Sequence, residues 1–147
     1  MKIFQANENH AEAIGILFDL YRQFYACDPD RALATDYIRA RLKAGDSTIF
    51  AAMDGEQTLG FVQLYPSFCS VQACRIYILY DLYVIEQRRE AGVGRALMER
   101  AREFALHNGA ERIDLLTAKN NHAGQHLYEK LGYVKTLQDF YAYSLAL

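Results

Sequence analysis

One short segment, residues 88–97 (RREAGVGRAL), constrains the fold and the function of this chain more than any other. It separates a long run of β-branched and aromatic residues, 74–85, from a stretch whose apolar side chains recur at helical spacing. Gly92 and Gly94 stand where that helix begins, although glycine costs a helix about 1 kcal/mol relative to alanine. The segment therefore predicts a strand, a glycine-containing turn and a helix in succession.

This turn has the features of a binding site for an anion. The first N–H groups of a helix have no acceptor within it, and the helix dipole adds partial positive charge there. Glycine lets the backbone approach a ligand closely. Three arginines, Arg88, Arg89 and Arg95, supply donors suited to phosphate. The segment predicts a phosphate or pyrophosphate site.

Two familiar phosphate-binding loops fit this segment poorly. A P-loop needs a Lys-Ser/Thr pair after its last glycine, whereas Arg95 and Ala96 follow Gly94. A Rossmann turn needs a third glycine or alanine three residues on, where this chain has Leu97. A nucleotide-binding domain is therefore disfavoured, and competition by ATP would be needed to support it.

The remaining segments predict one mixed α/β domain over residues 1–147, because no linker or repeat divides the chain. The expected strands are residues 1–6, 47–53, 58–65, 74–85 and 112–118, with two more within 133–147, and the expected helices are residues 10–25, 28–45, 92–107 and 121–130. Asp28 is expected to cap the second helix, with Pro29 as its first residue. A loop is expected at residues 66–72.

Composition and charge narrow the class of protein. The chain is 52% hydrophobic and carries a net charge of −2, which suits a globular protein and argues against nucleic acid as a partner. Cys27, Cys69 and Cys74 contain no C-x-x-C pair, so we expect reduced thiols that act as small packing residues. A leader-like apolar run and a membrane-length apolar stretch are both missing, so a cytoplasmic protein without membrane contact is expected.

Metal binding is not expected. His122 and His126 are four residues apart on a predicted helix, but no third ligand and no H-E-x-x-H pattern accompany them. A solvated helix face is the simpler interpretation of this pair.

Three segments together resemble one family. Residues 89–94 (REAGVG) match the R/Q-x-x-G-x-G/A signature of the GNAT superfamily, the acetyl-CoA-dependent N-acetyltransferases. Residues 80–84 (YDLYV) resemble its cofactor-contacting strand, and residues 121–133 (NHAGQHLYEKLGY) resemble its N-x-x-A-x-x-L-Y-x-x-x-G-F/Y block, with Gly124 in place of alanine. The resemblance is clearest over residues 58–134. It implies a single GNAT-type domain whose central mixed sheet is flanked by helices and holds CoA between splayed strands.

The resemblance also implies a cofactor site. In proteins like this, the CoA pyrophosphate lies on the amides of residues 90–95, and the pantetheine arm pairs with the backbone of residues 82–84. A bulge expected at residues 81–83 would direct an amide at the thioester carbonyl and stabilise the developing oxyanion. The implied cofactor-binding residues are Leu82, Tyr83, Val84, Arg89, Glu90, Ala91, Gly92, Val93, Gly94, Arg95, Asn121 and Tyr128.

Two residues are implied to be catalytic. Tyr128 occupies the motif position of an acid that protonates the leaving thiolate, and a phenol with a pKa near 10 suits that role. Asp81 lies on the strand beside the expected acetyl group, where it would bind the substrate ammonium or accept its proton through water. Purely structural roles, as a core tyrosine and as a solvated acid at a strand bulge, are the alternatives for Tyr128 and Asp81.

The resemblance predicts an N-acetyltransferase that acts on a primary amine by direct attack in a ternary complex. Residues 77–84 (YILYDLYV) also resemble the corresponding strand of diamine, polyamine and histone acetyltransferases, which favours a small polyamine-like amine. Protein N-termini or lysines, amino acids and aminoglycosides remain open as acceptors. A non-catalytic acyl-CoA-binding regulator is the rival, and a homodimer is plausible because the chain is expected to end in edge strands.

Overall fold

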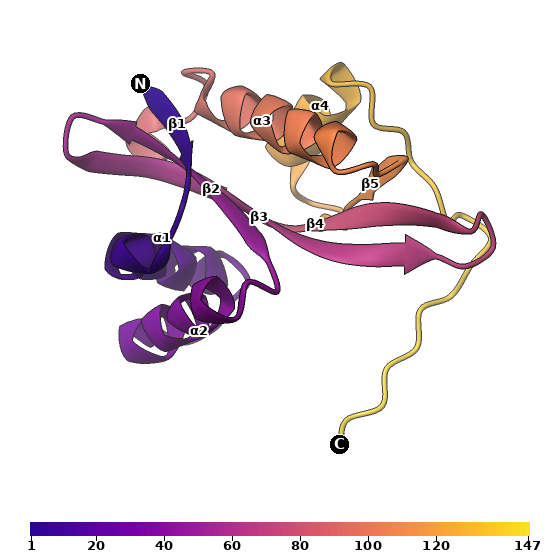
Figure 1. Cartoon of the computed structure of the whole chain (residues 1–147), viewed down its shortest axis with the longest axis horizontal. Helices are drawn as coiled ribbons and strands as arrows, with labels where there is room; N and C mark the ends of the chain where they lie inside the picture. The colour runs from indigo at the N-terminus through magenta and orange to yellow at the C-terminus, as the bar shows by residue number, and fades with distance from the viewer. The chain divides into compact units, whose positions relative to one another are not determined.

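A five-stranded mixed sheet runs through residues 1–116 (Figure 1). The computed structural model describes every residue from 1 to 147, and the chain divides into two compact units, residues 1–116 and 117–147. Antiparallel pairing joins the first four strands, whereas the fifth pairs parallel with the fourth. The strands are β1 (Lys2–Gln5), β2 (Thr48–Asp54), β3 (Gln57–Cys69), β4 (Cys74–Val84) and β5 (Arg112–Asp114), and they lie in chain order. The predicted mixed α/β fold is confirmed.

Helices cover both faces of this sheet (Figure 1). On one face, α1 (Ala11–Phe24) and α2 (Arg31–Ala44) bury their apolar stripes against Phe61 and its neighbours on β2 and β3. On the other face lies α3 (Val93–His107), whose Phe104 ring packs 5.4 Å from Phe50 and 5.4 Å from Tyr77. Two short 3₁₀ turns, η1 (Glu8–His10) and η2 (Glu86–Arg88), precede α1 and the glycine segment.

The start of α2 differs from the prediction that Asp28 caps it and Pro29 opens it. The N-cap is Asp30, whose carboxylate accepts a hydrogen bond from Leu33 N at 3.0 Å. Asp30 is fixed there because its own N–H donates to the Asp19 carboxylate of α1 at 2.9 Å. A tertiary contact with α1 therefore decides which of two neighbouring aspartates caps the helix.

The loop predicted at residues 66–72 begins too early, because β3 continues through Pro66 to Cys69. Pro66 pairs with Tyr77 of β4, but β2 pairs with β3 only as far as Leu64. Beyond Leu64, β3 is an edge strand, and an edge tolerates a residue that has no N–H to donate. The chain reverses instead at the four residues that follow Cys69.

The second unit, residues 117–147, contains α4 (His122–Lys130), as predicted, and no strand. Two strands were predicted within residues 133–147, in part from the alternation in residues 141–147, but this segment forms no ladder. Alternation predicts a strand only if a neighbouring edge supplies hydrogen-bond partners, and no such edge pairs with these residues. The side chains of Tyr141 and Tyr143 are exposed as a result. Across the whole chain, every helix falls short of the length and apolar character needed to cross a membrane.

Candidate active site

A β-bulge interrupts β4 at Tyr80. Gln63 of β3 pairs with Asp81, whereas the next residue, Leu64, pairs with Leu79, so Tyr80 is an extra residue in the ladder. Asp81 therefore lies directly after the bulge, opposite a buried glutamine.

This bulge exchanges the faces on which the side chains of β4 lie. In an uninterrupted strand, Tyr77 and Tyr83 share a face. Here Tyr77 packs against Phe104 of α3, whereas Tyr83 packs into the core cluster formed with α1. The sequence predicted the bulge at residues 81–83, whereas the structure has it one residue earlier, at Tyr80. This position turns the Asp81 carboxylate toward the α1 and α2 face.

The outer edge of β4 is open beyond the bulge. Only residues 76–78 of β4 pair with β5, which ends at Asp114 and not at residue 118 as predicted. The pairing with β5 stops at Ile78, just before the bulge, and a bulge bends and twists its strand. Leu79 and residues 81–84 thus pair with β3 on one side and with no strand on the other.

Backbone groups of Leu82 and Val84 point to this open edge. Ile85 N donates to Leu59 O of β3 at 2.9 Å. Since bonding direction alternates along an antiparallel strand, residues two apart share a direction, and Leu82 and Val84 face away from β3. In agreement, Val84 O accepts a hydrogen bond from the Arg89 Nε at 3.1 Å. An extended ligand arm has two residues here with which to form strand-like hydrogen bonds.

The glycine segment places two left-handed residues before α3. Glu90 has φ 63° and Gly92 has φ 81°, the conformation that creates concave groups of N–H donors. Gly92 is the N-cap of α3 and has no side chain with which to cap it. The N–H of Ala96 donates to Gly92 O at 3.0 Å. The earlier first-turn amides, on residues 93–95, face the helix N-terminus without a side-chain acceptor, which suits an anion.

The three arginines of this segment make contacts within the protein. Arg88 pairs with Asp54 at 3.1 Å, and Arg95 pairs with Glu99 at 2.8 Å. Arg89 lies over the Tyr83 ring and donates to Val84 O. Exposed ion pairs contribute only about 0–1 kcal/mol, so a phosphate group can compete for these guanidinium groups.

Asp81 ends a chain of buried hydrogen bonds. Its side chain is 4% exposed, and its carboxylate accepts a hydrogen bond from Gln63 Nε2 at 2.6 Å. Gln63 is itself fully buried, and its Oε1 accepts from Ser47 Oγ at 2.8 Å, which fixes the orientation of the amide. Burial raises the pKa of Asp81 above its ordinary 3.8, although hydrogen bonds from Gln63 and Tyr21 oppose this shift. The Tyr21 hydroxyl donates to Tyr80 O at 3.0 Å. Because a hydroxyl has a single proton, Tyr80 O and the Asp81 carboxylate compete for it.

Four tyrosines contact one another near this carboxylate, and we call them the tyrosine cluster: Tyr21, Tyr37, Tyr65 and Tyr80. The hydroxyls of Tyr37 and Tyr65 are 2.6 Å apart, and the rings of Tyr65 and Tyr80 meet edge to face at 5.7 Å. Burial, the bond to Tyr37 and the charge of Asp81 all raise the pKa of Tyr65. Tyr80 is 63% exposed, so the cluster reaches the surface.

In the second unit, Asn121 and Tyr128 belong to α4. Asn121 is the N-cap: its Oδ1 accepts from Gly124 N at 3.1 Å, and its Nδ2 donates to Thr117 Oγ1 at 3.0 Å. A Cβ at Gly124 would lie 2.5 Å from Asn121 Nδ2, so glycine at this position leaves room for the capping side chain. The ring of Tyr128 lies 6.1 Å from that of Tyr133, just beyond the helix.

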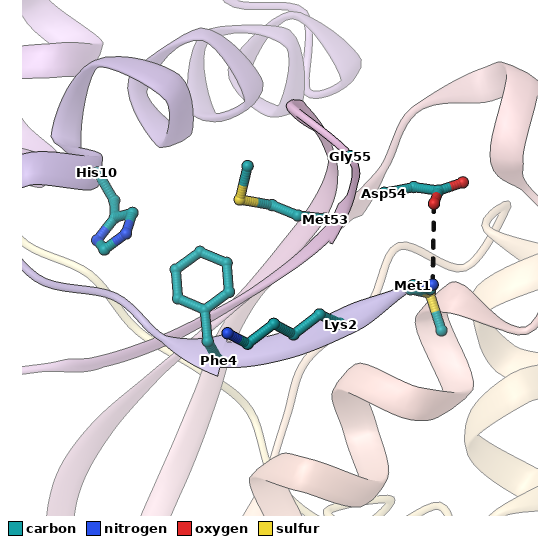
Figure 2. Close-up of a pocket in the computed structure, with 7 residues that line it drawn as sticks. All are labelled: Met1, Lys2, Phe4, His10, Met53, Asp54 and Gly55. Atoms are coloured by element: carbon teal, nitrogen blue, oxygen red, sulfur yellow. Dashed lines mark ion pairs between the residues drawn. The ribbon is translucent and has the colours of Figure 1, made fainter.

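A pocket of about 560 Å³ lies elsewhere in the first unit, at the ends of β1 and β2 (Figure 2). The Met1 amino group and the Asp54 carboxylate form an ion pair at 3.9 Å among the residues that line it. Its lining is Met1, Lys2, Phe4, His10, Met53, Asp54 and Gly55. None of these belongs to the glycine segment, the open edge of β4 or the tyrosine cluster, so we do not assign the active site to this pocket.

The sequence predictions missed Gln63, Ser47 and Tyr65. Gln63 carried a usable signal, because it is the one strongly polar residue in the apolar run LGFVQLY at residues 59–65. Its pairing with Asp81 depends on strand register, which the bulge sets. Ser47 and Tyr65 carried no signal, since they join the site only through tertiary contacts.

Comparison with known proteins places this geometry in a family. The model of the acetyltransferase (GNAT) family matches residues 14–133. The uncharacterized N-acetyltransferase YhfO of Bacillus subtilis is 41% identical over 133 residues, which cover 90% of this chain and 89% of that protein. A probable acetyltransferase of Haemophilus influenzae is 32% identical over 126 residues, covering 84% of this chain and 85% of that protein.

Solved structures agree. The crystal structure of a probable acetyltransferase superposes with a TM-score of 0.89 at 34% identity, covering 100% of this chain and 98% of that one. A ribosomal-protein-alanine N-acetyltransferase from Brucella melitensis has the same fold, with a TM-score of 0.80 at 20% identity and complete coverage of both chains. This chain, with its open-edged strand β4 and the glycine N-cap of α3, therefore belongs to the GNAT family, the N-acetyltransferases that take their acetyl group from acetyl-CoA.

Proposed function

We propose that this enzyme acetylates a small, positively charged primary amine of polyamine type, by direct attack of the amine in a ternary complex with acetyl-CoA. One observation carries the proposal: a buried carboxylate, Asp81, directly follows the bulge of β4 within the tyrosine cluster. A carboxylate removed from water attracts a cation more strongly than an exposed one does. Aromatic ring faces attract ammonium groups as well.

Acetyl-CoA fits the remaining features of the first unit. The uncapped amides of α3 and the left-handed residues before it suit a pyrophosphate. The open edge of β4 at Leu82 and Val84 suits an extended pantetheine arm. Acetyl-CoA supplies the acetyl group as a thioester. We assign the binding of acetyl-CoA to residues 82–84 and 89–95, with Asn121 as a further contact. We also infer that residues 1–147 act as one domain, because the family match extends into both units.

Two side chains have proposed chemical roles. An ammonium has no lone pair, so the amine must lose a proton before it attacks the thioester. Asp81 binds the cationic amine and accepts that proton through water. The raised pKa of Asp81 brings its proton affinity closer to that of a working base. Tyr128 donates a proton to the departing thiolate, the role that its motif position implies. Positioning the amine beside the thioester contributes the remaining acceleration.

The test is an acetyl-CoA-consumption screen over polyamines, monoamines without a second charge, amino acids, aminoglycosides and short peptides. The proposal predicts the highest kcat/KM for a small amine that keeps a positive charge at a second nitrogen. Preference for peptides or for neutral amines would contradict it. Tight acetyl-CoA binding with no turnover on any amine would instead support a regulatory module.

Gln63→Leu is expected to move the acidic limb of the pH profile of kcat/KM to higher pH. The hydrogen bond from Gln63 lowers the pKa of Asp81, so its loss lets Asp81 keep its proton to higher pH. The variant is then less active than the native enzyme at acidic pH and regains nearly native activity at alkaline pH. Ser47→Ala, which removes only the orienting bond to Gln63, is the control and is expected to give a smaller shift. A profile unchanged in Gln63→Leu would separate Asp81 from the chemistry.

Tyr128→Phe is expected to lower kcat by about 100-fold, the usual contribution of a positioned general acid, with little change in the Kd of acetyl-CoA. Tyr133→Phe, which alters the tyrosine packed against it, serves as the control and is expected to keep kcat. Turnover in Tyr128→Phe equal to that of the native enzyme would remove the acid role.

A further inference from the structure

Two cysteines face each other at the end of the β3–β4 hairpin. Cys69 is the last residue of β3, Cys74 is the first of β4, and the two are paired in the ladder across a four-residue turn. Directly paired residues of an antiparallel ladder have Cα atoms about 4.5–5.5 Å apart and side chains on the same face. A disulfide needs Cα atoms about 4.4–6.8 Å apart, so the backbone already meets its requirement. Both thiols are free and partly exposed.

The surroundings of the two sulfurs differ. The N–H of Gln72 and the guanidinium of Arg112 hydrogen-bond the Cys69 sulfur and lower the pKa of that thiol from 9.0. Arg112 is held in place by Asp114, whose carboxylate accepts two hydrogen bonds from it, at 2.7 and 3.0 Å. In contrast, burial and the negative charge of Glu111 raise the pKa of the Cys74 thiol. These surroundings favour the nucleophilic thiolate more at Cys69 than at Cys74.

We propose that Cys69 and Cys74 form a peroxide-reactive site, in which Cys69 is oxidised first and Cys74 then closes an intramolecular disulfide. The Cys69 thiolate attacks one oxygen of hydrogen peroxide and breaks the O–O bond, giving a sulfenic acid, and the departing hydroxide takes up a proton to become water. The Cys74 thiol then loses its proton and attacks the Cys69 sulfur, forming the S–S bond and releasing a second water. Two thiols lose two electrons in total, and one peroxide gains them.

This site is independent of the proposed acetyl transfer. Its residues come from the hairpin end and β5, and none belongs to the glycine segment, the open edge of β4 or the tyrosine cluster. Cysteine spacing alone did not predict it, since Cys-x₄-Cys has no meaning until a turn sets the two residues opposite each other.

The test is mass spectrometry of the whole protein after treatment with hydrogen peroxide. We expect a loss of about 2 Da, the mass of two hydrogens, reversed by a reducing agent. Trypsin cleavage after Lys43 and Arg75 leaves both cysteines on one fragment, residues 44–75, whereas Cys27 falls on residues 23–31. The bond must therefore appear within a single fragment.

Variants separate the two steps. Cys27→Ser is expected to form the disulfide as the native protein does. Cys74→Ser is expected to stop at a sulfenic acid on Cys69, which dimedone captures, and Cys69→Ser is expected to leave Cys74 reduced over the same time. Arg112→Gln is expected to slow the oxidation of Cys69 about tenfold, because it removes the charge that favours the thiolate. Arg102→Gln, an exposed arginine on α3, is the matched control with no change in rate.

Three outcomes would overturn the proposal. One is dimers linked through Cys27 as the main oxidised product. Another is a native protein in which Cys69 reacts with peroxide no faster than Cys27. The third is a Cys74→Ser variant in which Cys69 gains no oxygen. None of these results bears on acetyl transfer, which the amine screen tests separately.

Discussion

Asp81→Asn is expected to lower kcat/KM for cationic amines by about 100-fold and, at the same time, to raise the thermal stability of the protein at neutral pH. Activity falls because asparagine neither attracts an ammonium nor accepts its proton. The variant keeps an oxygen that can accept the hydrogen bond from Gln63, so the buried chain to Ser47 is preserved. The Kd of acetyl-CoA is expected to stay the same.

The gain in stability follows from the raised pKa of Asp81. Its pKa is higher in the folded protein than the ordinary 3.8 of an exposed aspartate, so the folded state binds the proton more tightly than the unfolded state does. The free energy of unfolding therefore decreases as pH rises from 3.8 through the folded-state pKa, and that loss is complete above it. Asparagine has no charge to bury, so the stability difference between variant and native protein grows over this pH window and vanishes below it.

The other buried aspartate provides a matched control. Asp19 is 8% exposed, and its two carboxylate oxygens accept hydrogen bonds from Asp30 N at 2.9 Å and Gln23 Nε2 at 3.1 Å. Asp19→Asn leaves one of these donors without its acceptor, so it is expected to destabilise the fold by about 1–3 kcal/mol. Enzyme that remains folded is expected to keep its kcat/KM. Melting curves across pH and steady-state kinetics measure both variants. An Asp81→Asn protein that is less stable and fully active would make Asp81 a structural residue.

Gly94→Asp is expected to weaken CoA binding by about 100-fold or more, with the fold intact. An acidic side chain in the first turn of a helix interacts favourably with the helix dipole, so α3 is not expected to unfold. The same carboxylate occupies the space in which the first-turn amides would bind a pyrophosphate, and its negative charge repels that anion. Loss of two charge-assisted hydrogen bonds, at about 1.5 kcal/mol each, corresponds to roughly a 100-fold rise in Kd.

An equivalent change in another helix is the control. Ala32 is the second residue of α2, as Gly94 is of α3, and it is exposed. Ala32→Asp introduces the same charge at the same helical position without approaching the glycine segment. Titration calorimetry with CoA is expected to show native affinity for Ala32→Asp and the loss for Gly94→Asp. Equal affinities in the two variants would rule out the glycine segment as the phosphate site.

Local signals in the sequence were sufficient for much of the fold. The glycine segment, the helical stripe after it and the block at residues 121–133 predicted α3, α4 and the family. These features depend on neighbours in the chain, such as a glycine N-cap or an apolar repeat, so they can be recognised without knowledge of tertiary contacts. The same local geometry explains why the first-turn amides of α3 have no side-chain acceptor, since the N-cap is a glycine.

The predictions that failed depended on partners distant in the chain. A strand at residues 141–147 required an edge to pair with, and Asp28 could cap α2 only if Asp19 had not bound Asp30 instead. Pro66 led to the prediction of a loop, but β2 pairs with β3 only as far as Leu64, so Pro66 lies in an edge strand that tolerates proline. In each case the local pattern was compatible with two structures, and a non-local hydrogen bond or its absence decided between them.

The family and the glycine-containing turn before α3 can be recognised from the sequence alone, because those features are encoded over a few consecutive residues. The surroundings of Asp81, in contrast, depend on how distant segments pair. One extra residue, Tyr80, shifts the register of β4 and turns Asp81 toward Gln63 and the tyrosine cluster, and the same pairing of β3 with β4 sets Cys69 opposite Cys74. Strand register is a property of two segments together, so neither segment reveals it alone.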